Sequence, residues 1–324
     1  MNLSDLPVRR LPLTVRPLAE ETVISFVTRL ASANEIPAAT LFRHLAPCHP
    51  GRRIIDMDAV LSLESLERLA VLSGRDTDAL ARTLPGQDHT PHTPLELGRP
   101  GLRWFRTHPR PQLACLLCTS RRGISDAVRV RVKDGRRVCR VHRRWTDGLQ
   151  RDLAKMPEII DAHARYRALL DGPRRLRAPT MVWKAQCIAL NWSWERMHPV
   201  LSERWAVRAR KLNIAFPYRG YDSPAAQCVV FPETVALAET LCHPDWRRHV
   251  AMVRDADLEH FYRYAFQAVG IPKASNRSPV QGDPITFWAG NLRAEHAKRR
   301  FDFWRDPLAA VLTRTPFPNI RHFA

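Results

Sequence analysis

Two pairs of metal-ligand residues, twenty residues apart, constrain this chain more than any other feature. The first pair is Cys115 and Cys118, and the second is Cys139 and His142. Thiolates and an imidazole at these spacings wrap a tetrahedral Zn²⁺ ion with two tight turns. Four protein ligands leave no open coordination position, so the pattern predicts one structural zinc ion and not a catalytic one.

The spacer between the two pairs has the pattern of a β-hairpin. Valine alternates with arginine or lysine over residues 128–133, which indicates a half-buried strand with a cationic outer face. Asp134-Gly135 is a strong two-residue turn, and residues 136–138 would form the return strand into Cys139. A block this small buries little apolar surface, so the metal would supply the missing stability of a small β zinc ribbon. The competing interpretation, four unligated core residues, leaves the regular pairs around a hairpin unexplained.

The chain is strongly basic, and the charge is concentrated around the predicted ribbon. It has 51 Lys or Arg residues against 32 Asp or Glu residues, a formal net charge of +19 over 324 residues. Fourteen of these cations and only three Asp lie in residues 99–150. This field attracts polyanions, and the forked guanidinium of arginine suits phosphates and base edges. DNA or RNA is the favoured partner, with an acidic protein or a merely solvated face as alternatives. The candidate contact residues are Arg75, Arg82, Arg129, Arg131, Lys133, Arg136, Arg137, Arg140, Arg143 and Arg144.

Before the ribbon, the sequence predicts two pairs of short helices. Apolar residues recur at three- or four-residue spacing from Ile24 to Ala31, as one buried helix face requires. Thr22 is the expected N-cap, and the helix should break at Asn34-Glu35, because Asn tolerates the left-handed conformation. A second helix follows over residues 38–45.

The second pair resembles a helix-turn-helix. Ser62 caps a helix that ends at Gly74, and a further helix starts two or three residues later. Ala70, Gly74 and Leu80 supply the small residue, the turn glycine and the apolar plug that this motif needs. The first pair repeats the arrangement loosely, with Glu35 in place of the glycine. Plain core packing of two short helices is the alternative interpretation.

The C-terminal half predicts a helical bundle. Residues 180–270 have long apolar periodicities with tryptophans, including Trp183, Trp192 and Trp205, which we expect in the core; a base-stacking surface is the alternative. Val250 to Val269 should line one face of another helix. The predicted fold class is mostly α with a small β zinc ribbon, in which helix-turn-helix units are followed by a helical bundle. The expected domains are 1–98, 99–150 and 151–324.

Several functional classes find no support in the sequence. It has no nucleophile elbow, P-loop, dinucleotide-binding glycine pattern or HExxH motif. The acidic group near Asp255 and His260 fits the wet side of a helix better than a metal nuclease. Seven cysteines without a signal peptide, and no spanning apolar run, favour a protein of the reducing cytoplasm with no membrane partner. The chain is therefore expected to be a binder or adaptor and not an enzyme.

The order of these parts resembles the TniQ family, target-selection proteins of bacterial transposons. The resemblance covers roughly residues 11–150 and includes the four zinc ligands. Its other motifs are Leu11-Pro12, Arg16-Pro17-Leu18, Glu21-Thr22, Ser25-Phe26, Arg29-Leu30-Ala31, Asn34 and Leu69-Ala70-Val71-Leu72-Ser73-Gly74. The family often has proline inside each ligand pair, whereas this chain has Cys-Leu-Leu-Cys and Cys-Arg-Val-His, and it has a single ribbon.

The resemblance implies a non-enzymatic role in transposition. Family members bind or are directed to target DNA and recruit an AAA+ ATPase regulator, which engages the transposase. Some relatives attach to RNA-guided CRISPR complexes and pair as homodimers. The leading hypothesis is therefore a zinc-containing, DNA-targeting adaptor. The first rival is a stand-alone zinc-containing transcriptional or defence regulator that binds DNA, and the second is a Mg²⁺-dependent nuclease.

Overall fold

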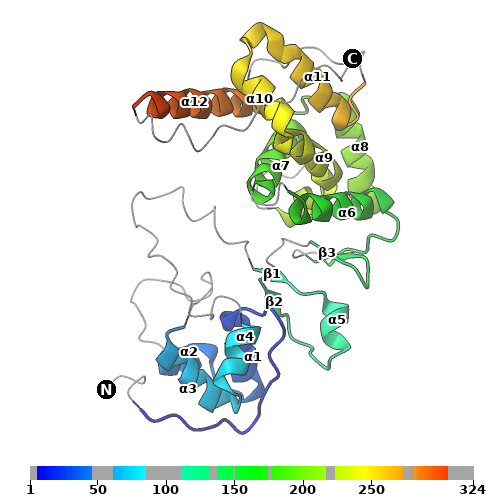
Figure 1. Cartoon of the computed structure of the whole chain (residues 1–324). Helices are drawn as coiled ribbons and strands as arrows, with labels where there is room; N and C mark the ends of the chain where they lie inside the picture. Colours follow the sequence, from blue (N-terminus) through cyan, green and yellow to red (C-terminus); the bar gives the residue numbers. More distant parts are fainter. Residues whose placement is uncertain are drawn as a thin grey trace. The chain divides into compact units, whose positions relative to one another are not determined.

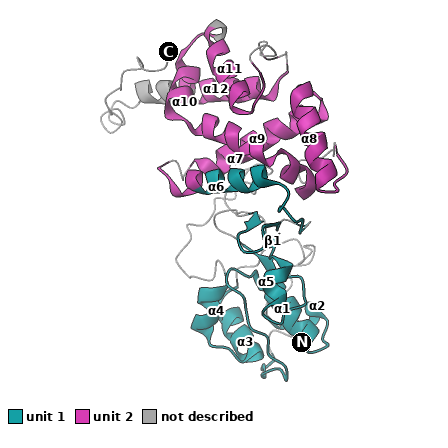
Figure 2. Ribbon diagram, turned by 90° about the vertical axis from the view of Figure 1, so that its right-hand side faces the viewer, with its two compact units in different colours: residues 1–167 teal, residues 168–324 magenta. Residues whose placement is uncertain are grey.

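The computed structural model describes residues 6–45, 61–84, 111–131, 137–146, 148, 150–173, 177–216, 223–272, 279 and 282–305, without the side chains of 255–256 and 298–305. The described residues are mostly helical, with two small antiparallel sheets (Figure 1), which confirms the mostly α class. They form two units, residues 1–167 and 168–324 (Figure 2). The three-part division at 98/99 and 150/151 stays a prediction.

Unit 1 begins with the two predicted helix pairs. The four helices are α1 (Val23–Ala33), α2 (Ala38–Leu45), α3 (Leu63–Ser73) and α4 (Thr77–Thr83). Thr22, Ser62 and Asp76 cap α1, α3 and α4, and each side chain accepts a bond from the backbone N–H three residues later. Gly74 ends α3 in the left-handed conformation, with a φ of 62°. Each of these local signals is confirmed.

The break after α1 differs in one respect from the expectation. Glu35 is the residue in the left-handed region, with a φ of 56°, while Asn34 has a φ of −103°. The Asn34 carboxamide serves another purpose: Oδ1 accepts from Leu13 N at 2.9 Å, and Nδ2 donates to Leu13 O at 2.7 Å and Leu30 O at 2.8 Å. Asn34 therefore ties the extended N-terminal segment to the end of α1.

All four helices share one apolar core. Ala70 and Leu80, the small residue and the plug of the predicted helix-turn-helix, are both buried in it. Ile24 is only half-buried, contrary to the expected face, because Val23 and Phe26 point inward instead. Each fully buried Leu or Phe contributes roughly 1.5–3 kcal/mol of transfer free energy. The other large members are Val27, Leu30, Leu41, Leu45, Leu61, Leu66, Leu69, Leu72 and Leu84.

The described residues of the metal-ligand segment form four two-residue strands and one short helix. They are β1 (Gln112–Leu113), α5 (Leu116–Ser120), β2 (Arg129–Val130), β3 (Val138–Cys139) and β4 (Arg144–Trp145). β1 pairs with β2, and β3 pairs with β4, both antiparallel. The predicted hairpin between β2 and the strand entering Cys139 is therefore wrong for the described residues. Its turn, Asp134-Gly135, lies outside them.

Both edges of β2 are occupied, which explains why β3 pairs elsewhere. On one side, Ala114 N donates to Val128 O at 2.8 Å. On the other side, Thr22 N donates to Arg129 O at 2.9 Å and Arg131 N donates to Glu20 O at 2.7 Å. The segment that precedes α1 thus acts as an additional strand beside β2. The alternation of valine with basic residues correctly predicted that Val128 is buried. It carried no information on which strand would pair with β2.

The helices of unit 2 surround a central apolar helix. α6 (Pro157–Asp171) crosses the division between the units. The helices that follow are α7 (Ala178–Trp194), α8 (Pro199–Lys211), α9 (Pro224–Cys242), α10 (Pro244–Met252), the 3₁₀ helix η3 (Asp255–Leu258), α11 (Glu259–Ala268) and α12 (Pro284–Arg305). α9 packs against α7, α8, α10 and α11. Trp192 and Trp205 are fully buried as predicted, whereas Trp183 is 54% exposed and lies outside the core.

The long helix expected over Val250 to Val269 is in fact three elements. α10 ends at Met252, and Val253 and Arg254 are extended, with ψ values of 162°. η3 and α11 then follow. Val250, Leu258 and Phe261 are still buried, so the apolar pattern correctly marked the core while the helix boundaries were wrong.

Among the described helices, α9 is long and apolar enough to meet the length and composition test for a membrane span. Its 18-residue window has a mean hydropathy of 1.2, and 83% of that window is buried inside the protein. A central helix enclosed by other helices passes the same test, so this helix is accounted for by its place in the core of unit 2.

Candidate metal centre and its surroundings

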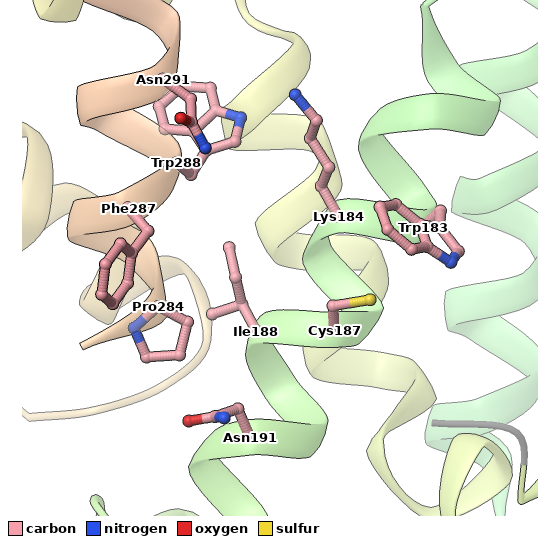
Figure 3. A pocket seen from close by; sticks show the side chains of 9 residues that line it. All are labelled: Trp183, Lys184, Cys187, Ile188, Asn191, Pro284, Phe287, Trp288 and Asn291. Carbon is pink, nitrogen blue, oxygen red and sulfur yellow. The ribbon is translucent and has the colours of Figure 1, made fainter. Parts of the chain in front are cut away.

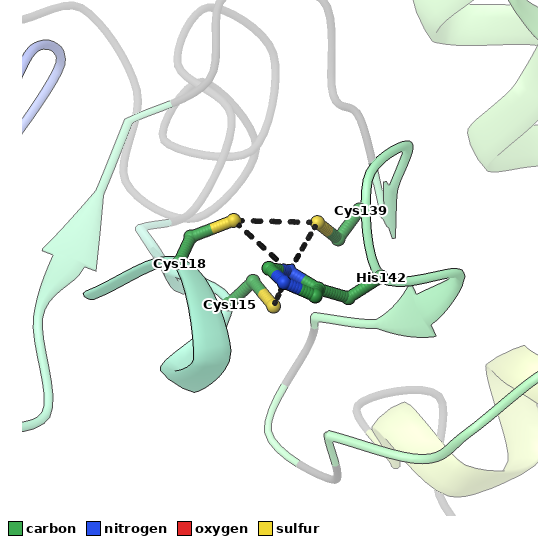
Figure 4. Close-up of side chains that lie close together, drawn as sticks. All are labelled: Cys115, Cys118, Cys139 and His142. Atoms are coloured by element: carbon green, nitrogen blue, oxygen red, sulfur yellow. Dashed lines mark hydrogen bonds between the residues drawn. The ribbon is translucent and has the colours of Figure 1, made fainter. Parts of the chain in front are cut away.

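The antiparallel strand pairs β1–β2 and β3–β4 of unit 1, called here the two metal-ligand hairpins, bring the four predicted ligands together (Figure 4). Cys115 is the residue before α5, and Cys118 lies within that helix. Cys139 ends β3, and His142 lies in the turn that leads into β4. Their ligand atoms all lie within 4.8 Å of one another, so this group can hold a metal ion.

The distances between the ligand atoms fit a tetrahedral ion. Nδ1 of His142 lies 3.5, 3.3 and 3.7 Å from the sulfur atoms of Cys115, Cys118 and Cys139. The sulfur atoms of Cys118 and Cys139 are 3.6 Å apart. For a zinc ion with Zn–S of about 2.3 Å and Zn–N of about 2.0–2.1 Å, tetrahedral geometry separates neighbouring ligand atoms by about 3.5–3.8 Å. The donor set and its spacing therefore suit Zn²⁺, with Nδ1 as the imidazole ligand.

The pKa values of two of the thiols, Cys118 and Cys139, are shifted in opposite directions. Burial, together with the neighbouring thiols of Cys139 and Cys115, raises the pKa of Cys118 to about 12. Burial also acts to raise the pKa of Cys139, but backbone N–H groups of His142 and Val141 and the neighbouring thiols lower it overall. A bound divalent cation is the kind of group that favours the thiolate form of a cysteine ligand.

A buried glutamine holds the two hairpins together independently of any metal. Gln150 Oε1 accepts from Leu116 N at 3.1 Å, and Nε2 donates to Ala114 O and to Thr146 O, both at 3.1 Å. One carboxamide thus joins the turn of the first ligand pair to the strand that follows the second. Gln150 is 7% exposed and has a φ of 51°. Sequence reasoning missed this residue, because nothing in its local pattern marks it.

A buried ion pair fixes the segment that lies beside β2. Glu21 is fully buried, and Arg29 donates to both of its carboxylate oxygens, from Nε at 2.8 Å and from Nη2 at 2.6 Å. Ser25 Oγ also donates to Glu21, at 2.9 Å, and accepts from Arg129 N at 3.0 Å. Arg29 Nη2 reaches Arg16 O as well, at 2.9 Å. Four of the motif residues that carry the family resemblance, Arg16, Glu21, Ser25 and Arg29, therefore belong to one polar network between α1, the N-terminal segment and β2.

The predicted contact arginines fall into three groups. Arg75, Arg82, Arg129, Arg140 and Arg143 are exposed, while Lys133 and Arg136 lie outside the described residues. Arg131, Arg137 and Arg144 are half-buried and have structural contacts. Arg137 lies 6.0 Å from the centre of the Trp145 ring, and Arg144 Nη2 donates to Gln150 O.

The three half-buried arginines are less suited to a ligand than the exposed ones. Burial lowers the pKa of Arg131, and Arg144 is committed to the backbone next to the metal-ligand group. Arg121 and Arg122, in the turn after α5, are exposed and were not among the predicted contacts. Their signal was present, because they lie in the same basic block of the sequence.

The fold and the site define a class: a mostly helical protein whose first unit joins paired short helices to a closed Cys₃His group that can hold a metal ion. Residues 12–146 match the TniQ family model, and this match supports assignment of the chain to the TniQ family. The matched segment runs from the N-terminal strand segment through all four candidate ligands, which confirms the resemblance found in the sequence. No curated protein and no solved structure matches the chain.

Proposed function

We propose that this protein is a non-enzymatic target-selection adaptor of a transposition system. The observation that carries the proposal is the TniQ match over residues 12–146, the segment that gathers the four candidate ligands into one group. The adaptor would mark target DNA, recruit an AAA+ ATPase regulator, and through it bring in the transposase. Its place of action would be the cytoplasm.

One structural Zn²⁺ is proposed at Cys115, Cys118, Cys139 and His142. When bound, the ion supplies a cross-link between the two hairpins and neutralises the thiolates. The remaining work belongs to the chain: Gln150 aligns the hairpins, and the Glu21–Arg29 network holds β2 beside the N-terminal segment. The metal would therefore fix the orientation of exposed arginines without contacting DNA itself.

Duplex DNA is the proposed ligand of the exposed arginines. Arg129, Arg140 and Arg143 belong to the metal-ligand hairpins. Arg75 lies in the turn between α3 and α4, and Arg82 lies within α4, in a helix pair that has the spacing of a helix-turn-helix. Contacts of this kind neutralise phosphates and release counterions, so affinity should fall steeply with salt.

This proposal can be tested by titrating a fluorescent 30-base-pair duplex at several salt concentrations. The triple change Arg129→Gln, Arg140→Gln and Arg143→Gln should weaken binding at low salt by at least about tenfold and flatten the salt slope by about two to three units. Arg263→Gln in unit 2, an exposed arginine paired with Glu259, is the matched control and should leave both unchanged. Wild-type affinity that stays constant as salt rises would overturn direct binding through these arginines.

The recruitment step separates the adaptor from a stand-alone DNA-binding regulator, which would use the same metal group and arginines. Bead-bound target DNA can be incubated with the AAA+ ATPase of the host transposon, with and without this protein. The adaptor predicts ATPase retention that depends on the protein. If the DNA retains this protein but not the ATPase, the stand-alone regulator is favoured. If the DNA retains this protein only when an RNA-guided complex is present, that complex selects the target. Mg²⁺-dependent cleavage of the DNA would support the nuclease instead.

A further inference from the structure

An open groove lies between α7 and α12 of unit 2 (Figure 3). Its volume is about 210 Å³. One face of α7 and the first two turns of α12 line it, with Ile188 and the buried Trp288 among the apolar lining residues. Figure 3 shows Trp183 and Phe287 on opposite sides of it, and both rings are exposed, by 54% and 64%.

These two exposed rings differ from the tryptophans that stabilise the core. Trp192 and Trp205 are fully buried, and each indole N–H donates to a carboxylate, of Asp283 and Glu233, at 2.9 Å. Trp183 and Phe287 instead leave more than half of their surface to solvent. Large aromatic rings exposed on both sides of a groove indicate a binding site for a planar or apolar ligand.

The polar groups of the groove are amides and a cation. Asn191 and Asn291 lie at opposite ends, and Lys184 lies toward the Asn291 end (Figure 3). A carboxamide offers both a donor and an acceptor, the combination that the edge of a nucleobase requires. Among the nine described residues that line the groove, none is acidic. The sequence of unit 2 has 23 Lys or Arg against 14 Asp or Glu, so its overall field also favours a polyanion.

We infer that the α7–α12 groove, flanked by Trp183 and Phe287, binds unpaired bases of single-stranded nucleic acid. Bases stack on the two exposed rings, the carboxamides form hydrogen bonds with base edges, and the Lys184 ammonium group pairs with a phosphate. Stacking tolerates any base, because every base has a π-face. The site is in unit 2 and outside the family match, so it stands independently of the duplex contacts proposed for unit 1.

Two exposed carboxylates restrict the path of the strand. Glu195 and Glu295 lie one helical turn beyond Asn191 and Asn291, past the two ends of the groove. Phosphates would be repelled there. The backbone is therefore expected to cross the groove near Lys184, with bases inserted between the rings, and not to run out past either end.

The test compares a fluorescent fifteen-nucleotide dT strand with an abasic strand of equal length and charge. The arginines of unit 1 would bind the phosphates of both strands, so the preference for the strand with bases isolates stacking. Wild-type full-length protein should bind dT₁₅ more tightly than the abasic strand. Trp183→Ala and Phe287→Ala should each reduce that preference by at least about fivefold, while Trp183→Phe should retain most of it.

Tyr264→Ala is the matched control, because Tyr264 is a 44% exposed aromatic residue of unit 2 outside the groove. It should leave the preference unchanged. Circular dichroism melting confirms that each variant is folded, and retained binding of a 30-base-pair duplex separates this site from the arginines of unit 1. Equal wild-type affinity for the two strands, or an unchanged preference in both alanine variants, would overturn the inference. If the alanine variants keep the preference for dT₁₅ over the abasic strand but no longer retain the ATPase on bead-bound DNA, the groove binds a protein partner instead.

Discussion

At the scale of single residues, the protein depends on buried polar groups that each have a defined partner. Glu21 and Arg29 are 0% and 4% exposed and form a bidentate pair within the core of unit 1. Removing one member of such a pair leaves the other buried and uncompensated, which costs far more than the loss of a surface ion pair. The family-like residues around α1 are therefore explained by folding and not by contact with a ligand.

Replacing Arg29 tests this explanation. Arg29→Ala should destabilise unit 1 by about 3–5 kcal/mol, because the Glu21 carboxylate loses its charged partner in a buried site. Arg263→Ala breaks an exposed pair with Glu259 and should cost less than about 1 kcal/mol. Urea unfolding followed by circular dichroism measures both. Similar small losses in the two variants would contradict the assigned role of the buried pair.

His198 gives unit 2 a pH dependence. Burial lowers the pKa of His198 below its usual 6.5, although Asp283 acts in the opposite direction. Because the folded state disfavours the charged imidazole, its stabilising contribution is present above about pH 6.5 and is lost as the pH falls below that value. Burial also raises the pKa of Asp283, which lies 4.0 Å from His198 Nε2.

The melting temperature should therefore fall between pH 7.5 and pH 5.5, and His198→Gln should reduce this fall. The comparison of the two proteins isolates the histidine from the other groups that titrate. Differential scanning calorimetry across this range provides the measurement. Parallel curves for wild type and His198→Gln would show that His198 does not control the acid sensitivity of unit 2.

At the scale of elements, local signals were predictable and long-range pairings were not. Thr22, Ser62 and Gly74 act through backbone groups within a few residues, so the sequence sufficed to place these helix ends. β2 pairs with β1 along one edge, and its other edge is occupied by the segment at Glu20 to Thr22, which is about a hundred residues away in the sequence. The ligand pairs were predictable because their spacing is itself the local geometry of the site.

The Gln150 clamp is testable at this scale. Gln150→Met preserves the length of the side chain but removes its three hydrogen bonds, which should cost about 1–3 kcal/mol because Leu116 N, Ala114 O and Thr146 O lose a partner. The Leu116 amide should exchange its hydrogen faster, as measured by NMR. An unchanged exchange rate at Leu116, with the rest of unit 1 also unchanged, would show that the carboxamide contributes little.

At the scale of the whole molecule, the two units differ in their sequence motifs, charge and architecture. Unit 1 carries the whole of the family match, the metal-ligand group and the densest positive charge. Unit 2 is a helical bundle around α9, in which the sequence correctly predicted the buried Trp192 and Trp205 but not the exposed Trp183. That difference could not be predicted, because a tryptophan on an apolar periodicity has the same pattern whether or not another helix covers it.

The role proposed for unit 1 depends on one zinc ion, held by Cys115, Cys118, Cys139 and His142, that stabilises the TniQ-like unit. Metal analysis of purified protein by inductively coupled plasma mass spectrometry tests it most directly. We expect about one zinc per chain in the wild-type protein. The zinc should be lost in Cys139→Ser and retained in Cys187→Ser, where the cysteine is outside the group. Wild-type protein without stoichiometric zinc, or Cys139→Ser with its zinc intact, would contradict the claim.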